Sequence, residues 1–171
     1  MTTLFNTQDC EVLEERSHDG WQRRTRLSPD TLFKMEAIYE RLSGNKSRIL
    51  RAVDWWSNWR TADDLPRDFQ FIDSSLDDPS HFVMLNHIGE ALGSMHGKRL
   101  SNIPVWSHAF YCVDEYNECR KSALPSAHYI EQSFDKFSRE YVRFMAPIQN
   151  ERGDVVLIVY AYRHLQLTRA E

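Results

Sequence analysis

The side chains best suited to chemistry are those of seven histidines and three cysteines. His81 and His87 lie six residues apart, His96 follows nine residues later, and no His-Glu-x-x-His motif occurs. A zinc site needs three or four ligands that converge with tight geometry, so this spacing predicts no metal site. Cys112 and Cys119 are seven residues apart, which places them on one face of a helix but about 10 Å apart along it. Packing of both thiols in a core is therefore favoured over a redox pair.

Other patterns that suggest catalysis fail on spacing. Only three residues separate Gly93 from Gly97, and Lys98 is followed by Arg99. A phosphate-binding P-loop has four residues between its glycines and a hydroxyl after its lysine. No Ser-His-Asp or Cys-His set falls on elements that must converge, and an enzyme with a cone-shaped α+β fold would need a His–Asp pair that cannot be placed. We therefore predict no catalytic residues and a protein that is not an enzyme.

Length and composition indicate one domain with a modest extension. The 171 residues are 42% apolar and 12% aromatic, which is enough for a buried core. Lys and Arg number 21 against 25 Asp and Glu, and the net charge of −4 argues against a nucleic-acid-binding surface. No apolar run approaches the roughly 18–20 residues that span a bilayer, and the N-terminus lacks the pattern of a signal peptide. With an odd number of cysteines, the sequence predicts a cytoplasmic protein with reduced thiols.

The first 64 residues are predicted to lie outside the main domain. Residues 1–27 are polar and aperiodic, with basic residues at Arg23, Arg24 and Arg26, and are expected to form a flexible N-terminal arm. Residues 28–64 are expected to form an extension of two helices, because apolar residues recur at helical spacing after a cap-and-proline start. The second helix carries three tryptophans, so it must pack against another apolar surface.

Residues 65–171 have a pattern of strands and short helices and are interpreted as one domain. Five strands are predicted, at Phe69–Asp73, His81–Asn86, Tyr129–Phe134, Tyr141–Gln149 and Val155–Leu165. A short helix is expected after Asn86, and a longer helical stretch from about Trp106 to Ser122. The predicted fold class is therefore α+β.

Several local patterns in this region resemble those of the PAS domain family. The resembling segments are Phe69-Gln-Phe-Ile-Asp73 and His81-Phe-Val-Met-Leu-Asn86 for the first two strands, Glu90-Ala-Leu-Gly93 with Gly97-Lys-Arg-Leu100 after them, and Tyr141-Val-Arg-Phe-Met-Ala-Pro-Ile148 with Gly153-Asp-Val-Val-Leu-Ile158 for the last hairpin. The resemblance covers residues 69–165 and is to stand-alone bacterial PAS proteins in which helices precede the domain. It implies a PAS-like five-stranded antiparallel sheet with short helices on one face, preceded here by the two N-terminal helices.

The resemblance also implies a small-molecule cavity between the sheet and the helices. Flavin-binding, light-sensing members carry a reactive Cys, and the corresponding stretch Gly97–Pro104 has none. Haem-binding members take a histidine from the long helix, here about Ala109–Ser122, so His108 and His128 beside it are displaced haem-ligand candidates. No cofactor is predicted, and haem or another small apolar ligand stays open. The cavity candidates, which fit ordinary core positions as well, are Met84, Leu92, Ile103, Phe110, Tyr116, Ile130, Phe144 and Ile158.

The last strand predicts that both faces of the sheet are covered. Val155–Tyr162 is apolar or aromatic throughout, so neither of its two alternating faces carries a charge. One face belongs to the core, and the other needs cover from the N-terminal helices of the same chain or of a second copy. A closed monomer and a homodimer therefore both stay open. The interface candidates are Trp55, Trp56, Trp59, Tyr160 and Tyr162.

For function, the resemblance implies a cytoplasmic single-domain PAS sensor that signals through protein–protein interaction. The expected partner is a regulatory protein, with a component of a histidine-kinase pathway as one option. Neither nucleic acid nor a membrane span is expected. The alternative is a small-molecule or haem-binding PAS sensor whose ligand occupancy is itself the signal.

Overall fold

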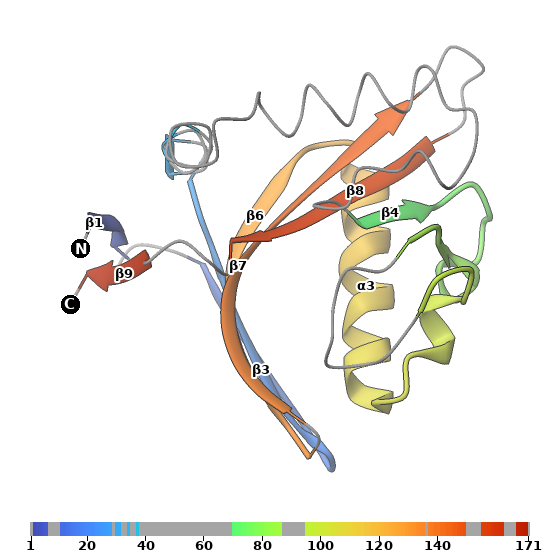
Figure 1. The fold of residues 1–171 in the computed structure, drawn as a ribbon, viewed down its shortest axis with the longest axis horizontal. Helices are drawn as coiled ribbons and strands as arrows, with labels where there is room; N and C mark the ends of the chain where they lie inside the picture. Colours follow the sequence, from blue (N-terminus) through green and yellow to red (C-terminus); the bar gives the residue numbers. More distant parts are fainter. Residues whose placement is uncertain are drawn as a thin grey trace.

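A strongly curved, open sheet of seven strands is the main element of the structure (Figure 1). The computed structural model describes residues 2–6, 11–28, 30, 31, 34, 37, 70–86, 95–135, 137–149, 155–162 and 167–170. In spatial order, the strands are β2 (Val12–Ser17), β3 (Gly20–Arg26), β6 (Ser126–Phe134), β7 (Phe137–Gln149), β8 (Val155–Tyr162), β4 (Gln70–Asp73) and β5 (Val83–Met84). Every neighbouring pair in this sheet is antiparallel. The helix α3 (Trp106–Ser122) lies on the concave face.

Shorter elements accompany the main sheet. Two 3-10 helices, η2 (Pro79–His81) and η3 (Leu100–Asn102), precede α3. Strand β1 (Thr2–Asn6) pairs in parallel with β9 (Leu167–Ala170) in a separate two-stranded sheet. Within the described ranges, no helix combines the length and the apolar character needed to cross a bilayer.

The α+β class and the antiparallel sheet agree with the sequence-based prediction, but the sheet has seven strands rather than five. Strands β4 to β8 come from the region predicted to hold five strands, and α3 has the bounds expected for the longer helical stretch. The second predicted strand is much shorter, because only Val83 and Met84 pair while His81 ends η2. Asp78 starts η2 by accepting a hydrogen bond from the Ser80 N–H at 2.9 Å, a local contact that competes with strand pairing.

The interpretation of residues 1–27 as a flexible arm is wrong, because β2 and β3 form a hairpin within the main sheet. β3 pairs with β6 at every position from Gly20 to Arg26. Its buried positions include the polar residues Gln22 and Arg24. The alternation of apolar and polar residues that identifies a half-buried strand is therefore absent from β3.

The start of β3 requires a glycine. Gly20 has a φ of +151°, and a Cβ atom there would lie 2.2 Å from the carbonyl oxygen of Ser133 and 2.7 Å from the Cα of Phe134. Both contacts are far too short and both involve the backbone of β6. The hairpin can therefore approach β6 this closely only with glycine at this position.

Asp19, in the turn of the same hairpin, caps the start of α3. Its carboxylate accepts hydrogen bonds from the backbone N–H of Ser107, at 3.3 Å, and from the Ser107 hydroxyl. Val105, the residue at the helix N-cap, supplies no side-chain hydrogen bond of its own. Desolvation acts to raise the pKa of Asp19, but hydrogen bonds from Ser107 and Ser17 outweigh it and lower this pKa. The hairpin is thus fastened to the helix by a charged cap.

Replacing Asp19 with alanine is expected to lower the free energy of unfolding by about 1 kcal/mol at pH 7, as the loss of a helix cap does. Because the folded-state pKa of Asp19 is lowered, the stabilisation is present above the unfolded-state value of 3.8 and is lost as the pH falls through the folded-state value. Urea unfolding measures the change. The control is Asp114→Ala, which removes an exposed carboxylate of α3; an equal loss in both variants would contradict the capping role.

The two predicted helices of residues 28–64 fall almost entirely outside the described residues, as do Trp55, Trp56 and Trp59. At the start of this segment, Ser28 Oγ accepts a hydrogen bond from the Thr31 N–H at 3.2 Å, in the manner of the predicted cap. The short helix expected after Asn86 also lies outside the described residues, over residues 87–94.

An apolar core fills the concave side beneath β8, β4 and β5. It includes Ile72, Phe82, Met84, Leu100, Ile103, Cys112, Tyr116, Cys119, Met145, Leu157 and Val159. Because successive side chains of a strand point to opposite faces of the sheet, Val156 points away from this core. Val156 is nevertheless fully buried, on the convex face. Burial of both faces of β8, predicted from its sequence, is therefore confirmed at Val156, Leu157 and Val159.

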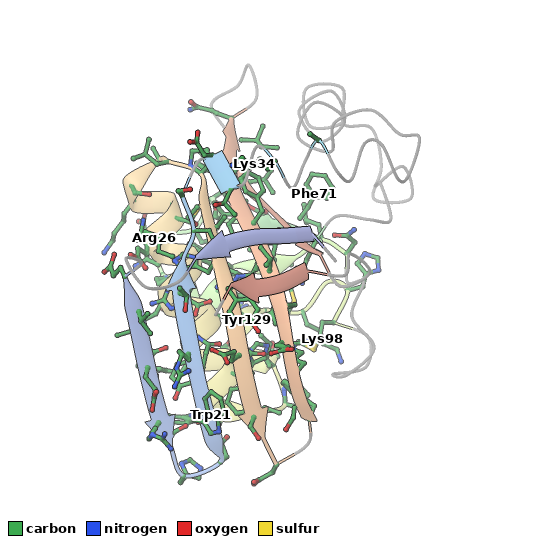
Figure 2. All side chains as sticks on the ribbon, turned by 90° about the vertical axis from the view of Figure 1, so that its left-hand side faces the viewer. Trp21, Arg26, Lys34, Phe71, Lys98 and Tyr129 are labelled. Atoms are coloured by element: carbon green, nitrogen blue, oxygen red, sulfur yellow. The ribbon has the colours of Figure 1, made fainter. Side chains whose placement is uncertain are left out.

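The convex face of β3 and β6 is charged and partly exposed. Figure 2 views this face, with Trp21 and Tyr129 labelled on the two strands. Arg23 lies 3.3 Å from a carboxylate oxygen of Glu14 on β2 and 3.5 Å from one of Glu131 on β6. Such exposed ion pairs contribute little to stability. The charged residues that are buried in this half of the sheet lie on its concave face.

Candidate ligand-binding site

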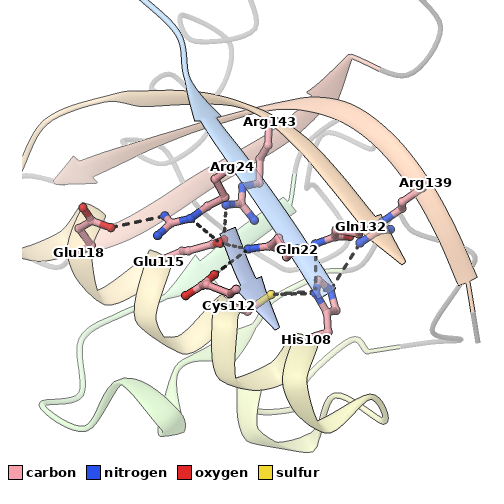
Figure 3. Close-up of polar contacts among 10 residues, drawn as sticks. Gln22, Arg24, His108, Cys112, Glu115, Glu118, Gln132, Arg139 and Arg143 are labelled. Atoms are coloured by element: carbon pink, nitrogen blue, oxygen red, sulfur yellow. Dashed lines mark hydrogen bonds and ion pairs between the residues drawn. The ribbon is translucent and has the colours of Figure 1, made fainter. Parts of the chain in front are cut away.

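Buried polar side chains separate α3 from the concave face of β3, β6 and β7 (Figure 3). Seven residues, each less than a tenth exposed, make up this polar layer: Gln22, Arg24, His108, Glu115, His128, Gln132 and Arg143. Desolvation of buried charges offsets most of their mutual attraction, so apolar side chains of similar volume would stabilise a fold as well or better. The polar layer therefore needs an explanation other than stability.

Glu115, on α3, is the centre of the layer. Its Oε1 atom accepts a hydrogen bond from Gln22 Nε2 at 2.6 Å and lies 3.2 Å from Arg24 Nε. Its Oε2 atom accepts a hydrogen bond from Arg143 Nη2. Burial acts to lower the pKa of Arg143, but the Glu115 carboxylate outweighs burial and raises it, so this guanidinium stays charged. The single negative charge of Glu115 is thus shared between the positive charges of Arg24 and Arg143.

The charges continue from Glu115 to the protein surface. Arg24 Nη1 lies 3.5 Å from Glu118, whose side chain is 55% exposed. Glu15, on β2, is half-buried and lies 3.4 Å from the Gln22 amide. Burial raises the pKa of Glu15, although Arg24 opposes this change. The rim of the layer therefore carries carboxylates that are better hydrated than Glu115.

Two glutamines link Glu115 to a histidine on the first turn of α3. Gln132 Nε2 donates a hydrogen bond to Gln22 Oε1 and lies 3.5 Å from His108 Nδ1. Arg139 Nε donates to Gln132 Oε1 at 2.9 Å, and its Nη2 lies 3.4 Å from His108 Nε2. Contacts therefore run without a break from Arg143 to His108 across three strands and one helix (Figure 3).

A cysteine next to His108 resembles a nucleophile–base pair but lacks the necessary thiolate. Cys112 Sγ lies 3.7 Å from His108 Nε2. Desolvation by burial, and secondly the Glu115 carboxylate, raise the pKa of Cys112 to about 12. Burial likewise raises the pKa of Cys119 to about 11. Both residues belong to the apolar core on an unbroken α3, which agrees with their predicted role in packing.

His128 lies directly opposite Arg143 in the β6–β7 ladder and opposite Arg26 in the β3–β6 ladder. It is 6% exposed. Burial first, and then the positive charges of Arg143, Arg24 and Arg26, lower the pKa of His128 to about 3. The imidazole is therefore neutral at physiological pH, in a positive electrostatic environment.

The cavity candidates from the sequence do not form one group. Met84, Ile103 and Tyr116 meet in the apolar core, and Ile130 is fully buried opposite Arg24. Phe144 is also fully buried, but on the other face, because its neighbours Arg143 and Met145 face α3. Phe110 is 53% exposed on the outer side of α3 and lines no cavity. Leu92 and the side chain of Ile158 are outside the described residues.

The haem-ligand and interface candidates have different outcomes. His108 lies within α3 rather than before it, and both it and His128 belong to the polar layer. Tyr160 and Tyr162 belong to β8, but the description of these two residues is limited to their backbone. Within the described part of the chain, no three His, Cys, Asp or Glu side chains are grouped to hold a metal ion.

Sequence reasoning missed the charged residues of the polar layer. One available signal was the helical spacing of His108, Cys112, Glu115 and Cys119, which places a carboxylate on the face that carries both buried cysteines. No comparable signal marks Gln22 or Arg24, because their shared buried partner, Glu115, lies more than 90 residues away.

No model of a known protein family, no curated protein and no solved structure matches this chain.

Proposed function

We propose that the chain is a PAS-like sensor domain that binds a small polar molecule in the polar layer and signals to a regulatory protein. The order of elements supports this proposal: β4, η2, β5, η3, the long helix α3 and then three long strands follow one another, which is similar to the order in the resemblance described above. The strands β2 and β3 extend this five-stranded arrangement at one edge.

The observation that carries the proposal is the position of the polar layer. It lies between the concave face of the sheet and the long helix, where PAS domains hold their ligands. Titratable groups with strongly shifted pKa values, such as His128, cluster at functional sites because function needs them despite their cost. A polar ligand would use the hydrogen-bonding groups of the layer to fix its orientation.

The surroundings of the two histidines favour a polar molecule over haem. Both ring nitrogens of His108 lie within 3.5 Å of Gln132 or Arg139 nitrogens. His128 is surrounded by guanidinium groups, whose charge opposes that of an iron cation. A Soret band in the absorbance spectrum of the purified full chain would favour the haem alternative.

Signalling through a regulatory protein, including a component of a histidine-kinase pathway, is the second part of the proposal. Two aromatic side chains of α3, Trp106 and Phe110, support it, since they are 63% and 53% exposed and their rings stack at 5.9 Å. Large aromatic groups left in water on a helix are typical of protein contact surfaces. Whether the chain also forms a homodimer is a separate question that sedimentation answers.

A thermal-shift screen of small polar molecules against the full chain tests ligand binding. We expect at least one chemical class to raise the melting temperature of the wild type in a concentration-dependent way. The effect should be smaller by half or more in Gln132→Ala, which removes an amide from the polar layer. Ser133→Ala is the matched control, because the neighbouring Ser133 lies on the exposed face of the same strand and bonds to Ser138.

Two results would count against the proposal. One is a screen in which no class of molecule stabilises the wild type. The other is a ligand whose stabilising effect is equal in Gln132→Ala, Ser133→Ala and the wild type, because such a ligand binds elsewhere.

A further inference from the structure

Three buried nitrogen atoms of the polar layer form no hydrogen bond with any described group: Arg24 Nε, which is nevertheless in an ion pair with Glu115 at 3.2 Å, His128 Nδ1 and Arg143 Nε. Their residues are 8%, 6% and 3% exposed. They lie on the adjacent strands β3, β6 and β7, with His128 opposite Arg143 and Arg24 two positions along β3 from the residue opposite His128. Native proteins rarely leave even one buried nitrogen unpaired, so His128 Nδ1 and Arg143 Nε, on opposite residues of β6 and β7, point to a missing partner.

The chemistry of these atoms defines the partner. An Nε–H group of arginine is a donor and never an acceptor, and His128 Nδ1 is a donor in one of the two neutral tautomers. Arg143 Nε and, in that tautomer, His128 Nδ1 are therefore donors that need an acceptor group, and Arg24 Nε is a third donor near Glu115. Oxygen atoms of a carboxylate, a phosphate, a carbonyl group or a water molecule would meet this need.

The positive charges of Arg143, Arg24 and Arg26 around His128 favour an anion among these acceptors. Among the described residues that are less than a tenth exposed, Arg24 and Arg143 carry positive charge and only Glu115 carries negative charge. The carboxylate of Glu118 is at the rim, 55% exposed and shared with Arg26. Glu118 and the half-buried Glu15 lie near Arg24 at the rim, whereas a water molecule or a carbonyl group would add no negative charge beside Arg143 and His128.

We propose that a small anion, with a carboxylate or phosphate group, binds between α3 and the concave face and accepts hydrogen bonds from Arg24, His128 and Arg143. This assignment rests on the proposed function and names the ligand class for it. The low pKa of His128 agrees with it, because burial lowers this pKa first and the positive charges of Arg143, Arg24 and Arg26 lower it further.

Access to the site involves the β2–β3 hairpin. The three nitrogens are shielded from solvent, and β3, which carries Arg24, is paired with β6 along its whole length, so an anion can enter only if the hairpin and α3 move apart. Asp19–Ser107 and Ser17–Tyr111 hydrogen bonds fasten this hairpin to the helix.

The test compares anions with a neutral isostere on the full chain at pH 7. Thermal unfolding is measured in sodium phosphate, sodium acetate, sodium chloride and acetamide, with ionic strength held constant by sodium chloride. We expect phosphate or acetate to raise the melting temperature in a saturable way and acetamide and chloride not to do so. The arginine Nε–H signals of Arg24 and Arg143 in nitrogen-15 NMR spectra should shift with the same saturation curve.

A charge-balanced variant shows where the anion binds. Glu115→Gln combined with Arg143→Met removes one charge of each sign and is expected to weaken anion binding at least tenfold. The matched control is Arg120→Met, which removes a guanidinium from α3 that donates to the backbone carbonyls of Ser74 and Asp77 outside the layer. This control should retain the wild-type affinity.

The outcomes separate the two proposals. If phosphate and acetate act no differently from chloride and the Nε–H signals of the wild type do not move, the anion assignment is wrong. It is also wrong if the charge-balanced variant binds as tightly as the wild type. If a neutral molecule from the thermal-shift screen binds and loses its effect in Gln132→Ala, the proposed function stands while the anion assignment falls.

Discussion

Replacing Glu115 with glutamine is expected to lower the free energy of unfolding by about 3–5 kcal/mol, the cost of removing one partner of a buried ion pair. Glutamine keeps the shape of the side chain and one acceptor oxygen. It leaves the guanidinium groups of Arg143 and Arg24 in the interior without a buried carboxylate. Urea unfolding followed by tryptophan fluorescence measures the loss, which is a large fraction of the stability of a typical domain.

The matched control is Glu118→Gln on the same helix. Glu118 also lies close to Arg24, at 3.5 Å, but its side chain is 55% exposed. An exposed pair of this kind is worth about 0–1 kcal/mol, so the control should lose less than about 1 kcal/mol. The double variant Glu115→Gln/Arg143→Met should recover part of the stability, because it removes both members of the pair. Losses of similar, small size in Glu115→Gln and Glu118→Gln would mean that the polar layer is hydrated in solution.

Acidification from pH 7 to pH 4 is expected to cost the fold about 3 kcal/mol through His128 alone. Its pKa is lowered to about 3 in the folded state, against an ordinary value of 6.5. Between these two values the unfolded chain binds a proton that the folded chain does not. The free energy of unfolding therefore falls by about 1.4 kcal/mol for each pH unit below 6.5, until the pH approaches the folded-state pKa.

Glutamine at position 128 cannot titrate. Between pH 6 and pH 4, the free energy of unfolding of His128→Gln should therefore fall less steeply with pH than that of the wild type, by the slope that corresponds to about one proton. Urea unfolding at several pH values measures this slope, in buffers free of phosphate and carboxylate so that no anion occupies the layer. His81→Gln, which replaces a histidine whose side chain is 44% exposed, should keep the slope of the wild type. An unchanged slope in His128→Gln would show that His128 is protonated or solvated in the folded protein.

These two expected effects have one origin, the burial of charge between α3 and the sheet. The stability of the fold does not require this buried charge, because apolar side chains would fill the same space without the cost of desolvating charged groups. The interior also differs from one side of the sheet to the other, with apolar contacts beneath β8 and β4 and polar contacts beneath β3 and β6. Ligand binding by the polar half, supported by the apolar half, is the arrangement that our proposals describe.

The sequence alone determined the elements whose faces are apolar. The bounds of α3 and the positions of β6, β7 and β8 are predicted from the sequence alone, because these segments carry many of the apolar side chains that the fold buries. The burial of both faces of β8 follows from its lack of any charged residue. Each of these features depends only on the residues of one short segment, so the sequence of that segment is enough to predict it.

Only the tertiary structure decided the place of the β2–β3 hairpin and the composition of the polar layer. Gln22 and Arg24 are polar residues in a polar segment, and nothing near them in sequence distinguishes a buried site from a solvated tail. What makes their burial possible is Glu115, 93 residues after Gln22, which supplies the compensating charge and acceptor oxygens. Burial of an apolar side chain is favourable against almost any apolar neighbour, whereas burial of a charge is favourable only beside particular partners. Those partners come together only in the folded chain, so they cannot be identified from the sequence around each charged residue.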